Sequence, residues 1–357
     1  MTTVNNDLAA LGADPLFGSG VGDLDGRTVV IAAGGGLIAR WVTAGLAALA
    51  RHHGQRLRLV ILVRSLAAAQ QWYSPHLVGV DHELRQQTLG QPWDYDGAAA
   101  LILHAGGGSS PGEYRRDPVG VAAANVRAAF DVLELARRRE SRVAYLSSRE
   151  VYGHARGTGQ PLSETVIGEF DHLSVRNVYP ESKRMTESLL VAYHQQYRID
   201  YQILRLASVY GPGMKLHDDG RAMSDLVSAR LAGSDLVLNS DGRARRAYCY
   251  VLDAARGVLA ALLLGAWPGV YNLANEREPV SIRELASRIA QLPVPGLPEA
   301  AVTTGPPAEP GSYSDFDYLG LDTTAVEALG WSPQVGLDDG LRRTLASFGE
   351  DGPNAAG

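Results

Sequence analysis

Cysteine is almost absent from the sequence, because Cys249 is the only thiol in 357 residues. A single thiol excludes an internal disulfide framework and a cysteine-rich metal site, and we predict no metal centre. We expect Cys249 to be a small buried residue within a strand.

Long apolar runs are also missing. No stretch of about 18 apolar residues occurs, so the sequence predicts no transmembrane helix. The first residues, Met-Thr-Thr-Val-Asn-Asn-Asp, lack the basic and apolar regions of a secretory signal. We therefore expect a cytoplasmic protein with no membrane partner. The formal net charge of −6 argues against a surface that binds nucleic acid.

Lysine is the scarce basic residue. Of 33 basic side chains only Lys183 and Lys215 are lysines, and all the others are arginines. Arginine stays charged, whereas lysine can take part in proton transfer. Lys183 follows Tyr179 by four residues, so on a helix both side chains lie on one face. An ammonium beside the phenol would lower the pKa of Tyr179 from about 10 toward neutrality, which makes Tyr179 a candidate general base. A surface helix with an ordinary Tyr and Lys would show the same spacing.

The chain does contain a regular alternation of apolar strands and helices. With 357 residues and 45% apolar content it can build a large core, as two domains or as one domain with a lobe. Strands that alternate with helices of this length predict βαβ units and a parallel sheet. We expect strands at residues 28–32, 57–63, 98–104, 142–146 and 201–206, and helices up to about residue 53, at 118–139 and at 180–196.

A glycine-rich turn follows the first expected strand and opens a helix. Its sequence, Gly34-Gly35-Gly36-Leu37-Ile38-Ala39, fits the pattern G-x-G-x-x-A of dinucleotide-binding turns. In that pattern the glycines let a pyrophosphate approach the backbone, and the helix N-terminus attracts its charge. We predict that Gly34, Gly36, Leu37 and Ile38 contact a dinucleotide cofactor.

The second strand leaves the type of dinucleotide open. It ends at Val63-Arg64, without the carboxylate that usually binds the ribose of NAD. Arg64 fits either a 2′-phosphate, as in NADP, or the face of an adenine ring. A solvated arginine at a strand end is the other interpretation.

The sequence pattern changes after Gly211-Pro212, where short elements with many glycines and prolines replace the regular alternation of strands and helices. We predict a dinucleotide-binding domain over residues 26–210. A smaller C-terminal lobe should follow, mainly over 211–348, with segments that return to the first domain. Residues 1–25 are rich in Gly, Asp and Ala, and we expect them to be loosely ordered. We expect a flexible tail at 349–357.

Taken together, these features resemble the extended short-chain dehydrogenase/reductase family over residues 27–348. The resemblance implies a Rossmann-type, doubly wound parallel sheet and a smaller nucleotide-sugar-binding lobe. It also implies NAD or NADP as cofactor, catalysis by Ser148, Tyr179 and Lys183, and cofactor contacts by Ala105, Asn125, Tyr179 and Lys183. Besides the glycine turn, the motifs that carry it are Ser147-Ser148-Arg149-Glu150-Val151-Tyr152-Gly153, Tyr179-x-x-x-Lys183, Arg205-x-x-x-Val209-Tyr210-Gly211-Pro212 and Leu329-Gly330-Trp331-Ser332-Pro333.

Within that family, three segments look most like UDP-glucuronate decarboxylases. The similarity implies that Arg221 meets the substrate carboxylate, that Glu150 is catalytic and that Arg246 binds the nucleotide diphosphate. For Arg221 and Arg246, a solvated surface arginine is the alternative. Further substrate contacts are expected from Ser110, Tyr114, Arg176 and Ser208. The segments are Ser148-Arg149-Glu150-Val151-Tyr152-Gly153, Ser110-Pro111-x-x-Tyr114-x-x-Asp117-Pro118, and Tyr210-Gly211-Pro212-Gly213-Met214 followed by Asp218-Asp219-Gly220-Arg221-Ala222.

The implied residues fit a decarboxylation that starts with oxidation. Oxidation of C4 of a glucuronosyl group needs a base, Tyr179, and a hydride acceptor, the nicotinamide. Ser148 would orient the same oxygen. The resulting ketone lies β to the C6 carboxylate, so CO₂ leaves readily while Arg221 orients the carboxylate. Glu150 is placed to manage a proton or a water near C5. Reduction of the ketone gives UDP-xylose, and earlier release gives the 4-keto pentose.

Departures from the family pattern keep other functions open. Ala33 stands where glycine is frequent, and Ser208 replaces an asparagine that contacts the diphosphate. Arg149 stands where 4,6-dehydratases carry an acidic residue, which argues against that reaction. A 4-epimerase needs only the Ser–Tyr–Lys set. A non-catalytic dinucleotide-binding regulator is the alternative of another class, although it need not keep that set. UDP and dTDP both stay open.

The resemblance finally implies a homodimer. The helices expected at 118–139 and 180–196 are those that pair in family dimers as a four-helix bundle. Ala and Leu on their outward faces fit this arrangement, as they also fit packing in the core.

Overall fold

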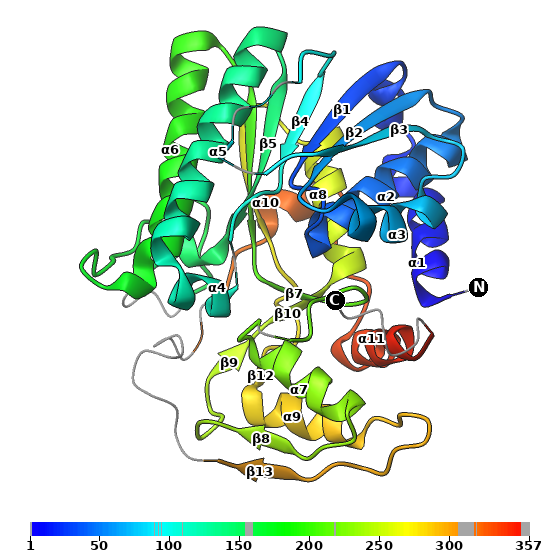
Figure 1. Cartoon of the computed structure of the whole chain (residues 1–357), viewed down its shortest axis with the longest axis vertical. Helices are drawn as coiled ribbons and strands as arrows, with labels where there is room; N and C mark the ends of the chain where they lie inside the picture. Colours follow the sequence, from blue (N-terminus) through cyan, green and yellow to red (C-terminus); the bar gives the residue numbers. More distant parts are fainter. Residues whose placement is uncertain are drawn as a thin grey trace.

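Seven parallel strands form the central sheet of the computed structural model, which describes residues 2–88, 90–91, 93, 95–108, 110–153, 160–217, 219–305, 318 and 320–350. The strand order is β11-β6-β5-β4-β1-β2-β3, and it reverses direction beside β1 (Figure 1). This is the doubly wound, Rossmann-type arrangement, so the predicted fold class is confirmed. The strands are β1 (Arg27–Ala32), β2 (Leu57–Val63), β3 (Asp81–Gln86), β4 (Leu101–His104), β5 (Arg142–Ser148), β6 (Tyr201–Leu206) and β11 (Gly269–Leu273).

Each face of the sheet packs against its own helices, because successive strand residues point to opposite sides. Ile61 and Leu103 belong to the core on one side, together with residues of α2, α3 and α8. Val60 and Ile102 belong to the core on the other side, with residues of α5 and α6 (Figure 1). These helices are α2 (Leu37–His53), α3 (Leu66–His76), α5 (Pro118–Arg139), α6 (Val178–Tyr197) and α8 (Val251–Leu264).

Helix α5 shows how local sequence sets an element's boundaries. The Asp117 carboxylate accepts a hydrogen bond from the Gly120 amide at 2.8 Å, and Pro118 occupies the first helical position. At the other end Glu140 adopts the left-handed conformation, with φ of 52°. The helix therefore covers the predicted range.

A smaller lobe lies beyond the carboxyl edge of the sheet (Figure 1). It contains three two-stranded sheets, in which β10 pairs with β7, β12 with β9 and β13 with β8. Helix α8 and strand β11 return from this lobe to the central sheet. The remaining elements are α4 (Pro111–Arg116), β7 (Ser208–Tyr210), α7 (Ala222–Leu231), β8 (Leu236–Leu238), β9 (Arg245–Arg246), β10 (Tyr248–Tyr250), β12 (Val280–Ser281), α9 (Ile282–Gln291), β13 (Val302–Thr304), α10 (Thr324–Glu327) and α11 (Leu337–Glu350).

The expectation of a loosely ordered segment at residues 1–25 is wrong. Helix α1 (Thr3–Gly12) begins there, followed by the 3₁₀ turns η1 (Pro15–Phe17) and η2 (Val21–Leu24). Val4, Leu8 and Leu11 recur at helical spacing and are buried in the same core as α2 and α8. This apolar stripe, rather than the Gly and Asp content, decides the local structure. Of the tail expected at 349–357, residues 351–357 lie outside the described part.

Asp7 ties α1 to the C-terminal lobe. Its carboxylate is buried, accepts a hydrogen bond from the Tyr250 hydroxyl at 2.8 Å and pairs with the Arg343 guanidinium at 2.6 Å. Burial raises the pKa of Asp7 above its ordinary value, against the opposing effect of these two partners. Asp7 therefore joins the first helix, strand β10 and helix α11.

Two further expectations concern buried and membrane-spanning segments. Cys249 is buried in strand β10, as predicted. Among the described residues, no helix is long and apolar enough to cross a membrane.

Replacing Asp7 with Ala should lower the free energy of unfolding by about 2–3 kcal/mol, because Tyr250 and Arg343 lose a buried partner. Urea denaturation followed by tryptophan fluorescence measures this. Asp23→Ala removes an exposed carboxylate from η2 and is the control, with an expected change below about 0.5 kcal/mol. Equal losses in the two variants would contradict the role assigned to Asp7.

Candidate active site

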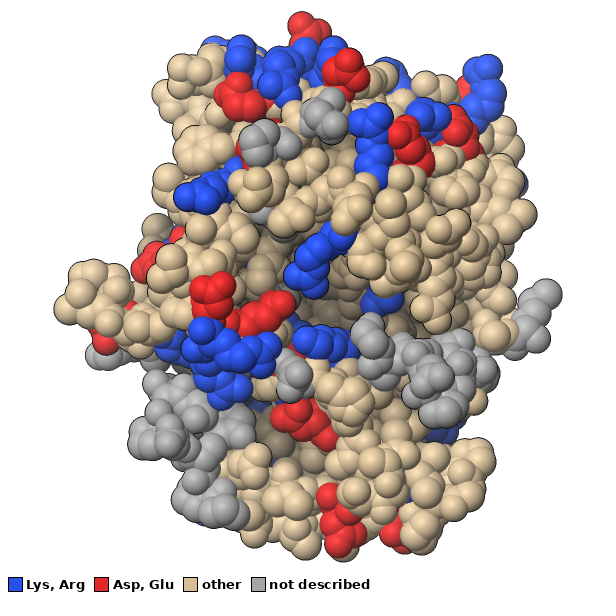
Figure 2. All heavy atoms as spheres, viewed as in Figure 1, with Lys and Arg blue, Asp and Glu red and all other residues tan. Residues whose placement is uncertain are grey.

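A cavity of about 740 Å³ lies between the carboxyl edge of the sheet and the C-terminal lobe. Its size is that of a site for a cofactor or small ligand. The space-filling view shows the molecule hollowed at this level, with basic and acidic side chains gathered around the hollow (Figure 2). Its walls come from the glycine turn after β1, the loops after β4, β5 and β6, and helix α7.

The glycine turn forms one end of this cavity. Gly36 caps α2, and Gly36, Leu37 and Ile38 line the cavity, so the free amides of the helix N-terminus are available to a pyrophosphate. Gly34 lies behind them. A Cβ placed on Gly34 would come within 2.3 Å of Ile61, and its carbonyl accepts a hydrogen bond from the Tyr73 hydroxyl at 2.6 Å. The turn therefore requires glycine at 34 for packing against β2 and α3.

Ala33 departs from glycine at a position where the backbone favours glycine. It adopts φ of 64°, in the left-handed region, although it carries a Cβ. An L-residue other than glycine is strained in that region. The turn into the candidate cofactor site is thus built with strain.

Arg64 lies apart from the cavity. It follows β2, is exposed, and does not belong to the residues that line the cavity. Its backbone carbonyl accepts a hydrogen bond from Gln86 at 3.3 Å. The cofactor contact expected of Arg64 stays a prediction.

Tyr179 and Lys183 are buried in the first turns of α6 and line the cavity, on one face as predicted. The Lys183 ammonium donates to the carbonyls of Leu146, at 2.9 Å, and Gly106, at 3.4 Å. It lies 5.9 Å from the centre of the Tyr179 ring. These two backbone carbonyls therefore hold the ammonium behind the phenol.

The predicted effect of Lys183 on Tyr179 is wrong for this structure. Burial, followed by the negative charge of Glu150, raises the pKa of Tyr179 to about 12. The hydrogen bond from Ser148 and the charges of Arg221 and Arg176 act in the opposite direction. Burial also lowers the pKa of Lys183 to about 8. Loss of hydration around the phenol thus outweighs the nearby cations, a balance that sequence spacing does not reveal.

Ala105 and Asn125 complete the surroundings of Lys183. Ala105 lines the cavity, whereas Asn125 is buried in α5 and donates to the Ser182 hydroxyl at 2.8 Å. A Cβ placed on Gly107 would come within 2.5 Å of the Asn125 side-chain oxygen and 3.3 Å of the Lys183 nitrogen. Asn125 therefore supports the loop after β4 from behind the cavity.

Ser148 and Glu150 enter the cavity from the end of β5 and from the turn η3 (Arg149–Tyr152). Ser148 hydrogen-bonds Tyr179, and its hydroxyl also accepts from the Glu150 amide at 3.2 Å. The Glu150 carboxylate pairs with Arg176 at 3.0 Å. The structure thus brings the predicted hydroxyl, phenol and carboxylate together.

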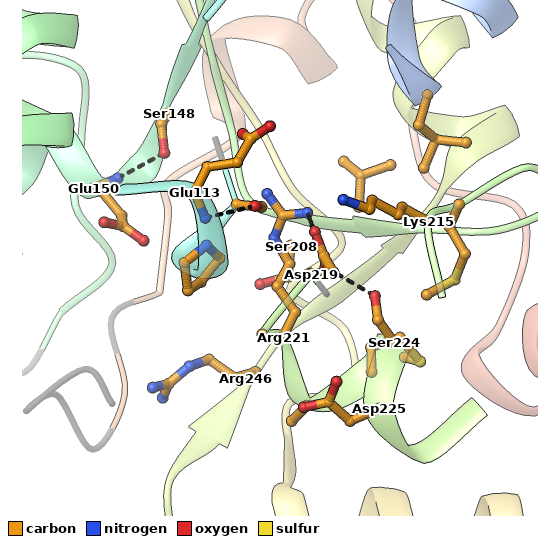
Figure 3. Close-up of a pocket in the computed structure, with 18 of the residues that line it drawn as sticks. Glu113, Ser148, Glu150, Ser208, Lys215, Asp219, Arg221, Ser224, Asp225 and Arg246 are labelled. Carbon is orange, nitrogen blue, oxygen red and sulfur yellow. Dashed lines mark hydrogen bonds and ion pairs between the residues drawn. The ribbon is translucent and has the colours of Figure 1, made fainter. Parts of the chain in front are cut away.

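Arg221 lies at the start of α7. Its guanidinium donates two hydrogen bonds to the buried Asp219 carboxylate, at 2.9 and 3.1 Å, and Asp219 also accepts from Ser224 at 2.9 Å. Figure 3 shows Ser148 and Glu150 on one side of the cavity and Lys215, Ser224 and Asp225 on the other, with Arg221 between them. The neighbouring Asp218 lies outside the described residues.

The remaining predicted substrate residues also line the cavity. Ser110 caps α4 by accepting from the Glu113 amide at 3.1 Å, and it is buried. The Tyr114 ring stacks on the Tyr179 ring with centres 5.6 Å apart. Ser208 lies in β7, and Arg246 in β9 donates to the Arg245 carbonyl at 2.6 Å.

With this geometry established, the chain can be compared with known proteins. The model of the NAD dependent epimerase/dehydratase family matches residues 30–274, more than half of the chain. The chain belongs to this family. The predicted resemblance to extended short-chain dehydrogenases/reductases is therefore confirmed.

Relatives and solved structures agree with this assignment. UDP-glucuronic acid decarboxylase 6 of Arabidopsis thaliana is 33% identical over 240 residues, which cover 67% of each chain. UDP-glucuronic acid decarboxylase 1 of Xenopus tropicalis is 30% identical over 247 residues, which cover 69% of this chain and 56% of that protein. The crystal structure of UDP-glucose 4-epimerase from Thermotoga maritima has a TM-score of 0.76 at 21% identity, covering 91% of this chain and 99% of that one. That of dTDP-glucose 4,6-dehydratase from Streptomyces venezuelae has 0.77 at 22%, covering 91% and 98%. Identities this low show a shared fold only.

Several residues that shape the cavity were not predicted from the sequence. Asp219, which fixes Arg221, was quoted within a motif but given no role. Arg40 lines the cavity, donates to the Gly213 carbonyl at 2.5 Å and lies 4.8 Å from the centre of the Trp72 ring. No local signal links position 40 to position 213, since only the fold brings α2 to the loop after β7.

Replacing Ala33 with Gly should raise the free energy of unfolding by up to about 1 kcal/mol, because glycine adopts a positive φ without strain. Thermal denaturation measures the change. Ala39→Gly, inside α2, is the matched control and should lower stability by about 1 kcal/mol. A loss of stability in Ala33→Gly would show that the turn is not strained.

Proposed function

We propose that this protein is an NAD-dependent decarboxylase of UDP-glucuronic acid. The observation that carries the proposal is that Tyr179, Glu150 and Arg221 line one cavity, close enough for both charges to act on the phenol. A 4-epimerase needs neither group. A sugar that bears a carboxylate can pair with Arg221, and its decarboxylation needs a proton at C5, which Glu150 can transfer. The relatives at 30–33% identity are decarboxylases of this substrate.

The residues of the glycine turn fit the cofactor. Gly36, Leu37 and Ile38 would hold its pyrophosphate at the N-terminus of α2. When bound, NAD would accept a hydride from the substrate. Lys183 is held in the wall of the cavity by the Leu146 carbonyl. The charges of Arg221 and Arg176 favour the phenolate form of Tyr179, which burial disfavours.

Oxidation at C4 is the first step. Tyr179 removes the proton of the C4 hydroxyl while the hydride leaves C4, and a C4 ketone results. Ser148, hydrogen-bonded to Tyr179, orients the same oxygen. Burial of Tyr179 keeps bulk water away from this proton transfer.

Loss of CO₂ follows because the ketone is β to the C6 carboxylate. The bond between C5 and C6 breaks, and its electron pair moves into the C4 carbonyl to form an enolate. Tyr179 and Ser148 stabilise the enolate oxygen by hydrogen bonds. Arg221, fixed by the buried Asp219, orients the departing carboxylate. Glu150 then transfers a proton to C5, directly or through a water.

Return of the hydride to C4 and of the proton from Tyr179 gives UDP-xylose. Release of the ketone before this step would instead give the UDP-linked 4-keto pentose. Arg246 and Ser208 line the cavity and would bind the diphosphate. Arg149 stands where 4,6-dehydratases carry an acidic residue, and its guanidinium cannot supply the acid that elimination at C6 needs.

The test is incubation of the purified protein with UDP-glucuronic acid and NAD⁺. We expect release of CO₂ and a UDP-pentose by mass spectrometry, with NAD⁺ regenerated if UDP-xylose forms. A product with two hydrogens fewer, together with stoichiometric NADH, would identify release of the ketone. A change of sugar configuration without change of mass would contradict the proposal and indicate an epimerase.

Arg221→Gln should weaken the use of UDP-glucuronic acid, measured as kcat/KM for CO₂ release, by about 100-fold, because a charge-assisted bidentate contact is lost. Arg116→Gln, at an exposed position in the last turn of α4, is the matched control and should stay near wild type. An unchanged kcat/KM in Arg221→Gln would remove Arg221 from the proposed carboxylate site.

The proposal includes a homodimer built by α5 and α6. The two helices pack against each other at one side of the molecule (Figure 1). Val119 and Phe130, three helical turns apart on α5, are exposed, as are Met185 and Val191 on α6. Apolar side chains of this kind fit a subunit contact. Light scattering at micromolar concentration should give twice the mass of the chain, and a monomer would contradict this part of the proposal.

A further inference from the structure

An ion pair links two turns at the wall of the cavity. Nη1 of Arg176, in η4 (Val175–Asn177), lies 3.0 Å from Oε2 of Glu150, in η3. The two side chains are about equally shielded, with 26% and 30% of their surfaces exposed. A pair shielded to this degree is stronger than one at an open surface.

Arg176 also covers an aromatic stack. Its guanidinium carbon lies 5.0 Å from the centre of the Tyr114 ring. Tyr114 is buried and stacks on Tyr179, with an angle of 16° between the rings. One guanidinium therefore contacts both the proposed proton-managing carboxylate and the ring that covers the proposed base.

We propose that Arg176 is a positioning residue for the reaction at Tyr179, which holds the Glu150 carboxylate in place and offsets its charge at the phenol. The inference rests on the proposed function only in assigning Tyr179 to the oxidation of C4. It does not depend on the loss of CO₂. The substrate contact expected of Arg176 stays a prediction beside this role.

The electrostatic part of this role follows from the opposed charges. After burial, Glu150 is the largest influence that raises the pKa of Tyr179, and Arg176 is among the groups that lower it. Loss of the Arg176 charge leaves the Glu150 charge uncompensated, so the phenol should bind its proton more tightly. Tyr179 would then be a poorer base near neutral pH.

Other groups face Tyr179 from every element around it. Ser148 approaches from β5, Lys183 from α6, Arg221 from the start of α7 and Tyr114 from α4. Tyr145, in β5, is a further titratable neighbour. A variant at position 176 replaces none of these groups, but it removes the contact of Arg176 with the Tyr114 ring as well as the ion pair with Glu150. Only the ion pair depends on Glu150, so a double variant with Glu150→Gln separates the two effects.

The first test is a titration of Tyr179 that needs no turnover. The protein is labelled with ¹³Cζ-tyrosine and studied by NMR with and without NAD⁺, and Tyr179→Phe identifies the resonance. Arg176→Gln should raise the pKa of Tyr179 by about one pH unit. The double variant Arg176→Gln/Glu150→Gln should return it to the wild-type value or below, because the charge that Arg176 offsets is then absent.

The second test is kinetic and follows NADH formed in a single turnover with UDP-glucuronic acid. The pH profile of C4 oxidation should move in the alkaline direction in Arg176→Gln, with a rate about tenfold lower at pH 7, since about tenfold less phenolate is present. KM should change little. Arg176→Lys keeps the charge but not the planar guanidinium, so its rate at pH 7 should lie between those of the wild type and Arg176→Gln.

Arg184→Gln is the matched control. Arg184 is also an arginine at this end of α6, and it donates to the Val151 and Gly168 carbonyls, both at 2.7 Å, so it supports η3 without contacting Glu150. It should lower stability and leave the pKa of Tyr179 unchanged. An unchanged pKa in Arg176→Gln, an equal shift in Arg184→Gln, or an effect on KM alone would overturn the proposal. A protein that releases no CO₂ would refute the proposed function and leave the NMR result standing.

Discussion

The geometry of the site depends on the hydrogen bonds that the buried Lys183 ammonium donates to backbone carbonyls. A charged group in the interior must be satisfied by polar partners, and here the partners are the backbone carbonyls of Gly106, in the loop after β4, and of Leu146, in β5. These carbonyls lie at the carboxyl edge of a parallel sheet, where the strands end side by side. The contact therefore fixes the start of α6 against that edge. Tyr179, one turn earlier on the helix, is placed over the cavity as a consequence.

Around this anchor, guanidinium groups are held in place by carboxylates. Asp219 holds Arg221, and Glu150 holds Arg176. Asp219 is buried and is itself fixed by Ser224, so the orientation of Arg221 is set before any ligand arrives. Groups that are oriented in advance stabilise charge in a ligand without reorganising when it binds. The cavity walls are therefore built for negative charge, yet each of these two cations is already balanced by an acidic partner.

The sequence was sufficient where local patterns decide structure. The buried strands, the glycine turn and the caps of α5 were predictable because apolar runs, glycines, Asp117 and Pro118 act on their immediate neighbours. Strand β3 was missed since its sequence, Asp-His-Glu-Leu-Arg-Gln, is polar, and Arg58 on the adjacent strand pairs with its Asp81 and Glu83. The proton affinity of Tyr179 was misjudged because burial is a property of the whole fold. For the same reason no spacing rule could reveal the pairing of Arg176 with Glu150.

The contact between Asp7 and Arg343 has a consequence for how the chain is made. The two residues are 336 positions apart. Helix α1 can pack on α2 soon after both leave the ribosome, since domains fold as their segments emerge. The Asp7 carboxylate remains hydrated until its partners Tyr250 and Arg343 have also been synthesised. Only the arrival of α11 allows it to be buried beside β10. Burial of Asp7 therefore depends on the meeting of two segments that lie 336 positions apart in the sequence.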